Sequence, residues 1–482
     1  MRYFHLLFLL IFCGELQAQP CREVVAFYPS WKWYDRGRLV NPSTIDYSKY
    51  SFINYAFLTP NKDGSISLFD PLADKTLLLG EFTDEANKGY KKSKALDRSL
   101  HRKGTSLVDK AHAHGVKVLI SIGGWTLSKN FPAVASSPIK RRRFAESCVE
   151  LIRTFQVDGV DIDWEYPRHQ EDAENFTLLI KEVSRLFDVL QKETGKKIWL
   201  TADFGAGRSH LEQIDWEAVA PLLDQINLMT YSYYGSKPSR TNHHSPLYAP
   251  RKGVEGYDIN SSVQLLTEKH LVHPSKINIG LAFFGRSLQT RGKADIHKAS
   301  QKLKDEKTFA KDKGTPAYYN IIAQQHKFYY KWDEQAGVPY LKGKKLKTFV
   351  TYDDEKSIFN KGRYIVENNL NGAIVWDIVG DYIEDKNRSG TIAETPLATA
   401  LSAGLCFQEK ELLAYTAPKR EQVAIQSLAQ QWTPLTRRTF APRLAYQAPE
   451  ISKKEKKKRK KKKRRKKKSK GDVPQRYFDG GW

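Results

Sequence analysis

One short run of the chain carries acidic side chains at a spacing that could do acid–base chemistry. Residues 158–165 read DGVDIDWE, in which Asp161, Asp163 and Glu165 alternate with apolar residues. On a β-strand, alternate side chains face the same way, so the three carboxylates would lie about 6.5–7 Å apart on one face. Like charges in a confined site raise one another's pKa. The run therefore predicts shared protons and a Glu165 that stays protonated as an acid near neutral pH.

Two other interpretations of this run are possible. Acidic residues also decorate exposed strands, and they bind Ca²⁺ or Mg²⁺ in loops. An exposed strand would rarely alternate its acids with Val160, Ile162 and Trp164. A metal site would usually bring further ligands. We therefore expect a catalytic carboxylate cluster that needs no metal and no cofactor.

The elements that would position these carboxylates form a regular series. Eight runs are rich in β-branched and aromatic residues, and nearly continuous apolar runs of this kind are typical of strands covered on both faces. The runs are 23–28, 51–58, 116–124, 157–165, 197–204, 225–231, 276–285 and 372–379. Amphipathic stretches lie between them, such as 138–155 and 173–193.

This alternation of strands and helices predicts a parallel sheet with right-handed crossovers. Eight units over roughly 380 residues favour a closed (β/α)₈ TIM barrel with insertions. The structural alternative is a doubly wound sheet, but no Gly-rich phosphate loop follows the first strand. Residues 288–353, between the last two strands, contain aromatic strand-like pieces separated by Gly, Pro and Lys. We expect them to form a small α+β insertion that deepens a groove.

Both ends of the chain differ from the rest. Residues 1–18 combine Arg2, the apolar run 6–13 and the small residue Ala18, a pattern that predicts a signal peptide. A lipid anchor at Cys13 is the alternative. The apolar run is too short for a membrane span, which needs about 20 residues. We expect a secreted or periplasmic protein whose catalytic domain spans 21–407.

Residues 408–452 show weak periodicity and are interpreted as a linker. Residues 453–482 would be a disordered basic tail with an aromatic end. Residues 453–470 hold 16 Lys and Arg and one Glu, so most of the chain's net charge of +25 lies there. Such a block could retain the protein at an anionic cell envelope. A secretion signal argues against nucleic acid as the partner.

Three cysteines follow the predicted signal peptide. Cys148 lies at helical spacing with apolar residues and is expected to be a buried thiol. Cys21 and Cys406 bracket the predicted barrel, whose closure would bring its first strand and last helix together. A disulfide between them is one hypothesis and two free thiols are the other.

These residues resemble a known family. The run 158–165 is similar to the DxxDxDxE pattern of glycoside hydrolase family 18, the chitinases and their relatives. The resemblance extends over about residues 21–400 and includes the insertion before the eighth strand. It is also carried by Ser121-Ile122-Gly123-Gly124-Trp125, Met229-Thr230-Tyr231, Gly235, Ser245-Pro246-Leu247-Tyr248, Phe284-Gly285-Arg286 and Trp376.

The resemblance implies a retaining, substrate-assisted hydrolysis of β-1,4 links between N-acetylglucosamine units. Glu165 would protonate the glycosidic oxygen, and the 2-acetamido oxygen of the substrate would attack C1 to give an oxazolinium ion. Asp163 would orient the acetamide N–H, and Asp161 would hold or share a proton with Asp163. Tyr231 would hydrogen-bond the acetamide carbonyl, and Trp376 would form the floor under the sugar.

Further binding residues are expected at or just past the strand ends, where barrel enzymes place their sites. Each of them could equally be packed in the core. They are Tyr28, Phe57, Gly124, Trp125, Tyr233 and Arg286.

One position departs from the family's pattern. The family commonly has Asp directly after the sixth-strand Tyr, where this chain has Ser232, and Tyr234 replaces what is often His. A hydroxyl cannot carry the negative charge that would support the intermediate. The change predicts lower activity, an altered pH optimum or a different substrate. Because Glu165 and all three aspartates remain, we still expect an active enzyme.

Three functions remain open at this point. The first is a chitinase acting on chitin or N-acetylglucosamine oligosaccharides. The second is a hydrolase of peptidoglycan or of N-glycans, since fold and acid do not fix the substrate. The third is an inactive chitin-binding lectin, although such lectins typically lose the acid equivalent to Glu165. Nothing in the pattern requires an oligomer, and we expect a monomer.

Overall fold

The structure, a computed structural model, describes residues 21–83, 97–234, 240–302, 305 and 308–406. The signal peptide predicted at 1–18, the linker at 408–452 and the basic tail at 453–482 lie outside the described residues. The described residues all belong to one compact unit of the chain.

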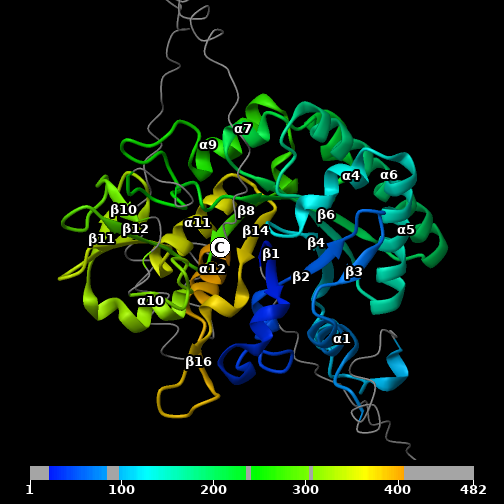
Figure 1. The fold of residues 1–482 in the computed structure, drawn as a ribbon, viewed down its shortest axis with the longest axis horizontal. Coiled ribbons are helices and arrows are strands. Elements are labelled where there is room, and N and C mark those ends of the chain that lie inside the picture. Colours follow the sequence, from blue (N-terminus) through cyan, green and yellow to red (C-terminus); the bar gives the residue numbers. More distant parts are fainter. Residues whose placement is uncertain (1–20, 84–96, 235–239, 303–304, 306–307, 407–482) are drawn as a thin grey trace, which may run out of the picture. The chain divides into compact units, whose positions relative to one another are not determined.

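A closed barrel of eight parallel strands forms the centre of this unit (Figure 1). Every strand predicted from the sequence is present, and pairing between the first two strands completes the ring. The (β/α)₈ prediction is confirmed. The barrel strands are β1 (Glu23–Pro29), β2 (Phe52–Pro60), β4 (Lys117–Gly123), β5 (Gly159–Asp163), β6 (Trp199–Gly205), β7 (Gln225–Met229), β8 (Ile277–Ala282) and β14 (Gly372–Trp376).

The strands are buried on both faces, and the two faces differ in chemistry. The outward face packs into one large apolar cluster with the helices. The inward face holds a smaller apolar cluster together with buried polar side chains. These polar residues are Asn54, Ser121, Asp161, Asp163, Thr201, Asp203, Gln225, Asn227 and Asn278. With a polar interior of this kind, the strands can supply reactive side chains as well as apolar core residues.

The helices predicted on both sides of β5 are also present. Helix α5 spans Pro138–Phe155, beginning with Pro138 at its first position and with Ser137 as the N-cap. Proline fits a first turn because its missing N–H would have no helical partner there. Helix α6 spans Gln170–Thr194 and ends at Gly195 in the left-handed conformation.

Shorter elements fill the other crossovers. The connection between β1 and β2 contains 3₁₀ segments, Ser30–Arg38 and Tyr47–Lys49, among its described residues. Strand β3 (Ile66–Leu68) pairs antiparallel with β2. Among the residues that the structure describes, the other α-helices outside the insertion are α1 (Pro71–Leu79), α3 (Leu107–Ala113), α4 (Phe131–Ala135), α7 (Arg208–Leu211), α8 (Trp216–Val219), α9 (Ile259–Gln264), α11 (Glu355–Glu367) and α12 (Pro396–Cys406). A small ribbon, β15 (Ile383–Glu384) with β16 (Ile392–Glu394), precedes α12.

An antiparallel sheet of five strands with one helix stands between β8 and α11. It begins at Arg286, two residues before the predicted start of the α+β insertion. Its order is β10-β9-β13-β12-β11, so the first long strand pairs with the last one in the chain. The elements are β9 (Arg286–Thr290), β10 (Ser300–Lys302), α10 (Tyr318–Gln324), β11 (Phe328–Asp333), β12 (Val338–Gly343) and β13 (Thr348–Thr351). They lie on the side of the barrel away from α5 and α6 (Figure 1).

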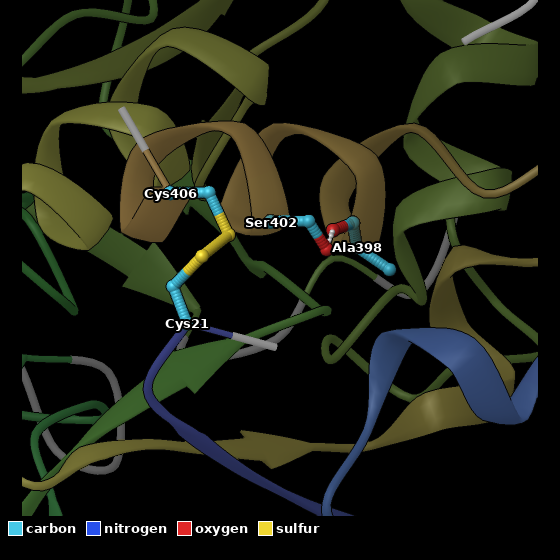
Figure 2. The surroundings of a disulfide bond; sticks show 4 residues. All are labelled: Cys21, Ala398, Ser402 and Cys406. Atoms are coloured by element: carbon cyan, nitrogen blue, oxygen red, sulfur yellow. Dashed lines mark hydrogen bonds between the residues drawn. A yellow bond between two sulfur atoms is a disulfide. The ribbon is translucent and has the colours of Figure 1, made fainter. Parts of the chain in front are cut away.

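A disulfide joins the two ends of the barrel (Figure 2). Cys21, just before β1, bonds to Cys406 at the end of α12, with Cα atoms 5.2 Å apart. Of the two hypotheses for these cysteines, the structure has the disulfide. Cys148 is a free, fully buried thiol on α5, as predicted.

The described helices include none that combines the length and the apolar character needed to span a membrane.

Candidate active site

Strand β5 directs a column of carboxyl groups into the barrel. Asp161 and Asp163 are buried on its inward face, while Val160 and Ile162 pack outward among the helices. Glu165 follows two residues after the strand's last residue and is partly exposed. The alternation predicted from the sequence therefore holds along this strand.

Asp161 is held by donors from neighbouring strands. Ser121 and Thr201 are its partners in the strand registers on either side. The Ser121 hydroxyl donates to Oδ2 at 2.7 Å, and the Thr201 hydroxyl donates to Oδ1. The Asn227 amide adds a longer bond to Oδ1, at 3.3 Å. Burial still raises the pKa of this carboxyl, and the three donors oppose that rise because they favour its ionised form.

The backbone around Glu165 is fastened to the loop after β4. The Glu165 N–H donates to the Ser128 hydroxyl oxygen at 2.9 Å, and this hydroxyl lies 2.8 Å from the Gly124 carbonyl oxygen. The Gly124 N–H donates to the Asp163 carbonyl at 2.8 Å. These hydrogen bonds fix where β5 ends and where the chain turns toward Glu165.

Burial and mutual repulsion set the protonation of the column. Burial, and then the charges of Glu165 and Asp161, hold the pKa of Asp163 well above its ordinary value. Burial raises the pKa of Glu165 to about 7, against hydrogen bonds from Tyr166 and the Trp125 backbone that lower it. Glu165 is therefore largely protonated below neutral pH, which is the state that a general acid requires.

A fourth carboxyl lies beside these three. Asp203 on β6 is buried on the inward face, and the register of β5 with β6 pairs Ile162 with Ala202, one residue before Asp163 and Asp203. Burial, followed by the charges of Asp161 and Asp163, raises its pKa well above the ordinary value. Sequence reasoning missed this residue. Strand alternation in LTADF would have found it, since Thr201 and Asp203 share a face.

Aromatic rings line the opposite side of the barrel mouth. Trp376, at the end of β14, stacks on Phe57 with ring centres 5.6 Å apart and an angle of 19°. Phe27 packs against the same indole at 5.4 Å. Gly124 allows this packing, because a Cβ there would meet the Phe57 ring at 2.5 Å and its φ of +82° is one that favours glycine.

Three large aromatic side chains remain exposed near these rings. Trp31 is 40% exposed, Phe69 46% and Trp125 53%. Trp31 contacts Trp376 at 6.4 Å and Phe69 at 6.2 Å between ring centres, so these rings form a continuous surface. Exposed apolar rings in contact mark a binding surface more than a core. Trp31 and Phe69 were not among the predicted binding residues.

Tyr231 lies next to the carboxyl column. Burial, and then the charges of Asp203, Asp163 and Glu165, raise the pKa of its hydroxyl well above the ordinary value. The hydroxyl is therefore a donor throughout the physiological range. Gly280 permits this position, because a Cβ on it would approach the Tyr231 ring at 2.8 Å.

Arg286, at the start of the insertion, reaches Ser232. Its Nη2 donates to the Ser232 hydroxyl at 2.8 Å, and its guanidinium lies 5.5 Å from the centre of the Phe284 ring. Burial lowers the pKa of this guanidinium to about 10, and the charge of Tyr166 opposes that shift. The predicted site residue Arg286 thus borders the barrel mouth, with Ser232 as its described hydrogen-bond partner.

Two of the predicted binding residues lie elsewhere. Tyr28 is fully buried on the outward face of β1, where its hydroxyl donates to the Val40 carbonyl at 2.8 Å. Tyr233 points its hydroxyl to Ser262, 2.6 Å away, and to the Asp258 carbonyl. Both belong to the packing around the barrel, and the inward residue of β1 at this level is Phe27.

Comparisons with known proteins agree on one family. The model of the glycosyl hydrolases family 18 matches residues 23–381. Chitinase A1 of Niallia circulans is 29% identical over 403 residues, which cover 76% of this chain and 57% of that protein. The chain therefore spans little more than half the length of this curated relative.

Solved structures give the same result. Chitinase ChiA74 from Bacillus thuringiensis superposes with a TM-score of 0.67 at 26% identity, over 80% of this chain and 69% of that one. YKL-39, solved in the presence of chitooligosaccharides, has a TM-score of 0.67 at 25% identity, over 80% of this chain and 100% of the other.

Proposed function

Because the chain belongs to the glycosyl hydrolases of family 18, we propose that it is a chitinase-like enzyme that cleaves β-1,4 links between N-acetylglucosamine units. The proposed reaction is retaining and substrate-assisted, as the family resemblance implies. The observation that carries the proposal is the column of buried carboxyl groups on β5 that leads to Glu165. Burial, which raises the pKa of Glu165 to about 7, supports it.

Glu165 is the proposed general acid. It donates its proton to the glycosidic oxygen as the bond to C1 breaks, and it later removes a proton from the attacking water. A pKa near the working pH suits a group that must give and take a proton in one cycle. The Glu165 N–H donates to the Ser128 hydroxyl, and the Trp125 backbone bonds to the Glu165 carboxyl. Both contacts support the orientation that the acid needs.

Asp163 and Tyr231 are the proposed partners of the substrate's acetamide group. Asp163 Oδ1 is buried and accepts no hydrogen bond from the described residues, which leaves it free to accept the acetamide N–H. The Tyr231 hydroxyl stays protonated and would donate to the acetamide carbonyl. The acetamide oxygen then attacks C1. Asp163, having passed its proton to Asp161, carries the negative charge that balances the oxazolinium ion.

The aromatic surface is the proposed sugar-binding face. Trp376 would lie under the sugar at the cleavage point, with Phe57 behind it, and Trp31 and Trp125 would offer further flat surfaces. Flat apolar rings pack against the apolar faces of sugars. The chitooligosaccharides present in the YKL-39 structures support a ligand of this class.

A secreted or periplasmic location remains part of the proposal. The Cys21–Cys406 disulfide supports it, because disulfides persist in oxidising compartments. Retention at an anionic envelope through residues 453–470 is a separate proposal, which rests on their charge alone.

Product release from N-acetylglucosamine oligomers by wild type, Glu165→Gln and Glu150→Gln tests the proposed function. Glu150 is exposed on the outer helix α5 and serves as the matched control. We expect Glu165→Gln to lose about 10²–10⁴-fold in kcat while it still binds oligomers. The control should match wild type.

Two other results would change the assignment. If wild type and Glu165→Gln bind oligomers and neither cleaves them, the protein is a chitin-binding lectin. If neither binds, peptidoglycan fragments and N-glycans become the substrates to try.

A further inference from the structure

Asp203 has surroundings that differ from those of the other carboxyl groups in the barrel. Both of its carboxyl oxygens are buried, and no N–H or hydroxyl group of the described residues lies within hydrogen-bonding geometry of either. Asp161, on the neighbouring strand, receives donors from Ser121, Thr201 and Asn227. An ionised carboxylate buried without donors is costly, whereas a protonated one needs only an acceptor.

Asp161, on the neighbouring strand, offers such an acceptor. Burial raises the pKa of both carboxyl groups, and the contact between them raises that of Asp203 further while it opposes the rise for Asp161. Asp161 already receives three donors and Asp203 receives none. In a bond between the two carboxyl groups the proton therefore belongs on Asp203, and Asp161 is the acceptor. The Asn227 amide bonds to Asp161 and lies close enough to lower the pKa of Asp203, but burial outweighs that effect.

No positive charge among the described residues offsets the group. The titratable side chains that face Asp203 are Asp161 and Asp163 on β5, Tyr231 after β7, and Tyr166 and His210 across a small cavity. Burial lowers the pKa of His210, so this ring is not a ready source of positive charge.

The cavity next to Asp203 gives little help from solvent. Its volume is about 10 Å³, at the lower limit for a single water molecule. Its walls are mostly aromatic and apolar, and they include Trp164, Phe176 and Phe204. Water therefore does little to stabilise a charge on Asp203.

We propose that Asp203 is a positioning residue that carries a proton in a carboxyl–carboxylate pair with Asp161. Asp161 would then share a proton with Asp203 on β6. This sharing would add to, or replace, the sharing of a proton with Asp163 on its own strand. By keeping Asp161 ionised and in place, Asp203 sets the electrostatic field in which Asp163 takes up and releases its proton. This role rests on the proposed function, since it acts through Asp163.

Two substitutions separate this role from its alternatives. Asp203→Asn keeps a donor, because its amide N–H can replace the acid O–H toward Asp161. Asp203→Leu keeps the branched shape of the side chain but has no donor. We expect Asp203→Asn to keep kcat within about threefold of wild type, and Asp203→Leu to lose about tenfold or more, which is the value of a hydrogen bond to a charged group.

The pH profile of kcat gives a readout that a merely structural role would not move. Without a donor the pKa of Asp161 rises, so the acidic limb for Asp203→Leu should move to higher pH. The acidic limb for Asp203→Asn should lie at the same pH as that of wild type. The proposal is overturned if both variants match wild type, or if Asp203→Asn loses as much as Asp203→Leu, which would mean that Asp203 works as an anion.

Infrared difference spectra at neutral pH test the protonation of Asp203 without using activity. Subtracting Asp203→Asn from wild type should remove a protonated-carboxyl band. Asp188→Asn, which changes an exposed carboxyl on α6, is the control and should remove a carboxylate band. Loss of a carboxylate band in Asp203→Asn would refute the assignment. If wild type fails to cleave any oligomer, the spectra still decide on the proton, and only the proposed function fails.

Discussion

The guanidinium of Arg286 donates a hydrogen bond to the hydroxyl of Ser232, 54 positions earlier in the chain, at 2.8 Å. The contact joins the first strand of the insertion to the segment that follows β7. Ser232 has a φ of +59°, a conformation in which Asp is several-fold enriched over most residues. A carboxylate at this position would thus meet a partly buried cation in a backbone conformation that Asp tolerates.

Ser232→Asp should therefore stabilise the protein. A neutral hydrogen bond becomes a charge-assisted one, and we expect the free energy of unfolding to rise by about 1 kcal/mol. The added negative charge should also support a cationic intermediate and raise kcat by up to about tenfold. Denaturant unfolding and turnover of oligomers measure the two effects. Ser232→Ala, which only removes the acceptor, should change both in the opposite direction, and a destabilised Ser232→Asp would contradict the prediction.

The alkaline limb of the pH profile should report Glu165. Its pKa is raised from 4.5 to about 7, mainly by burial. The protonated acid is fully present well below that value and is lost as the pH rises through it. We expect kcat/KM for N-acetylglucosamine oligomers to fall above about pH 7. An alkaline limb that starts near the ordinary pKa of a glutamate would show that another group limits the reaction.

Trp376→Ala should weaken the binding of oligomers more than it destabilises the fold. Loss of the indole removes the flat surface that rests on Phe57 and Phe27. We expect KM to rise about tenfold, which corresponds to about 1.4 kcal/mol of binding energy. Steady-state kinetics on oligomers of increasing length would measure it.

Tyr28→Phe is the matched comparison for that experiment. It should cost about 1 kcal/mol of stability through the hydrogen bond to the Val40 carbonyl. Its KM should stay at the wild-type value, because Tyr28 faces the outer helices. A raised KM would show that Tyr28 contributes to substrate binding.

Breaking the disulfide should destabilise the barrel. The bond joins two cysteines that are 385 positions apart in the chain. Removal of a native disulfide typically costs about 2–5 kcal/mol of stability. We expect Cys406→Ser to lower the free energy of unfolding by an amount in that range, and Cys21→Ser to add nothing to it. Thiol titration of denatured wild type should rise by two on reduction. An unchanged thiol count would mean that the bond is absent.

The sequence predicted the barrel well because parallel strands covered on both faces leave long apolar runs. It placed Asp163 on the inward face of its strand, with Glu165 after it, for a related reason. Acids that alternate with large apolar residues such as Ile162 and Trp164 rarely occur on an exposed strand. Tyr28 was predicted from its place near a strand end, although alternation assigns the inward face to Phe27. A position along a strand is therefore weaker evidence than the face on which the residue lies.

Other features depended on contacts between distant segments. The hydrogen bond between Ser232 and Arg286 and the aromatic surface of Trp31 with Phe69 follow from loop conformations that no local pattern encodes. The order of the insertion sheet, in which β9 pairs with β13, is of the same kind. Asp203 is different, because its strand was predicted and simple alternation along that strand places it on the inward face.

The cysteine pair that closes the barrel also places the two ends of the catalytic unit side by side, with Cα atoms 5.2 Å apart. In such a ring of β/α units, the point at which the chain is cut is nearly independent of the architecture. The unit should accept circular permutation, with a short linker in place of the disulfide and new termini in an exposed loop. Its eight-fold arrangement, more than the order of its strands in the gene, is what holds the carboxyl column in place.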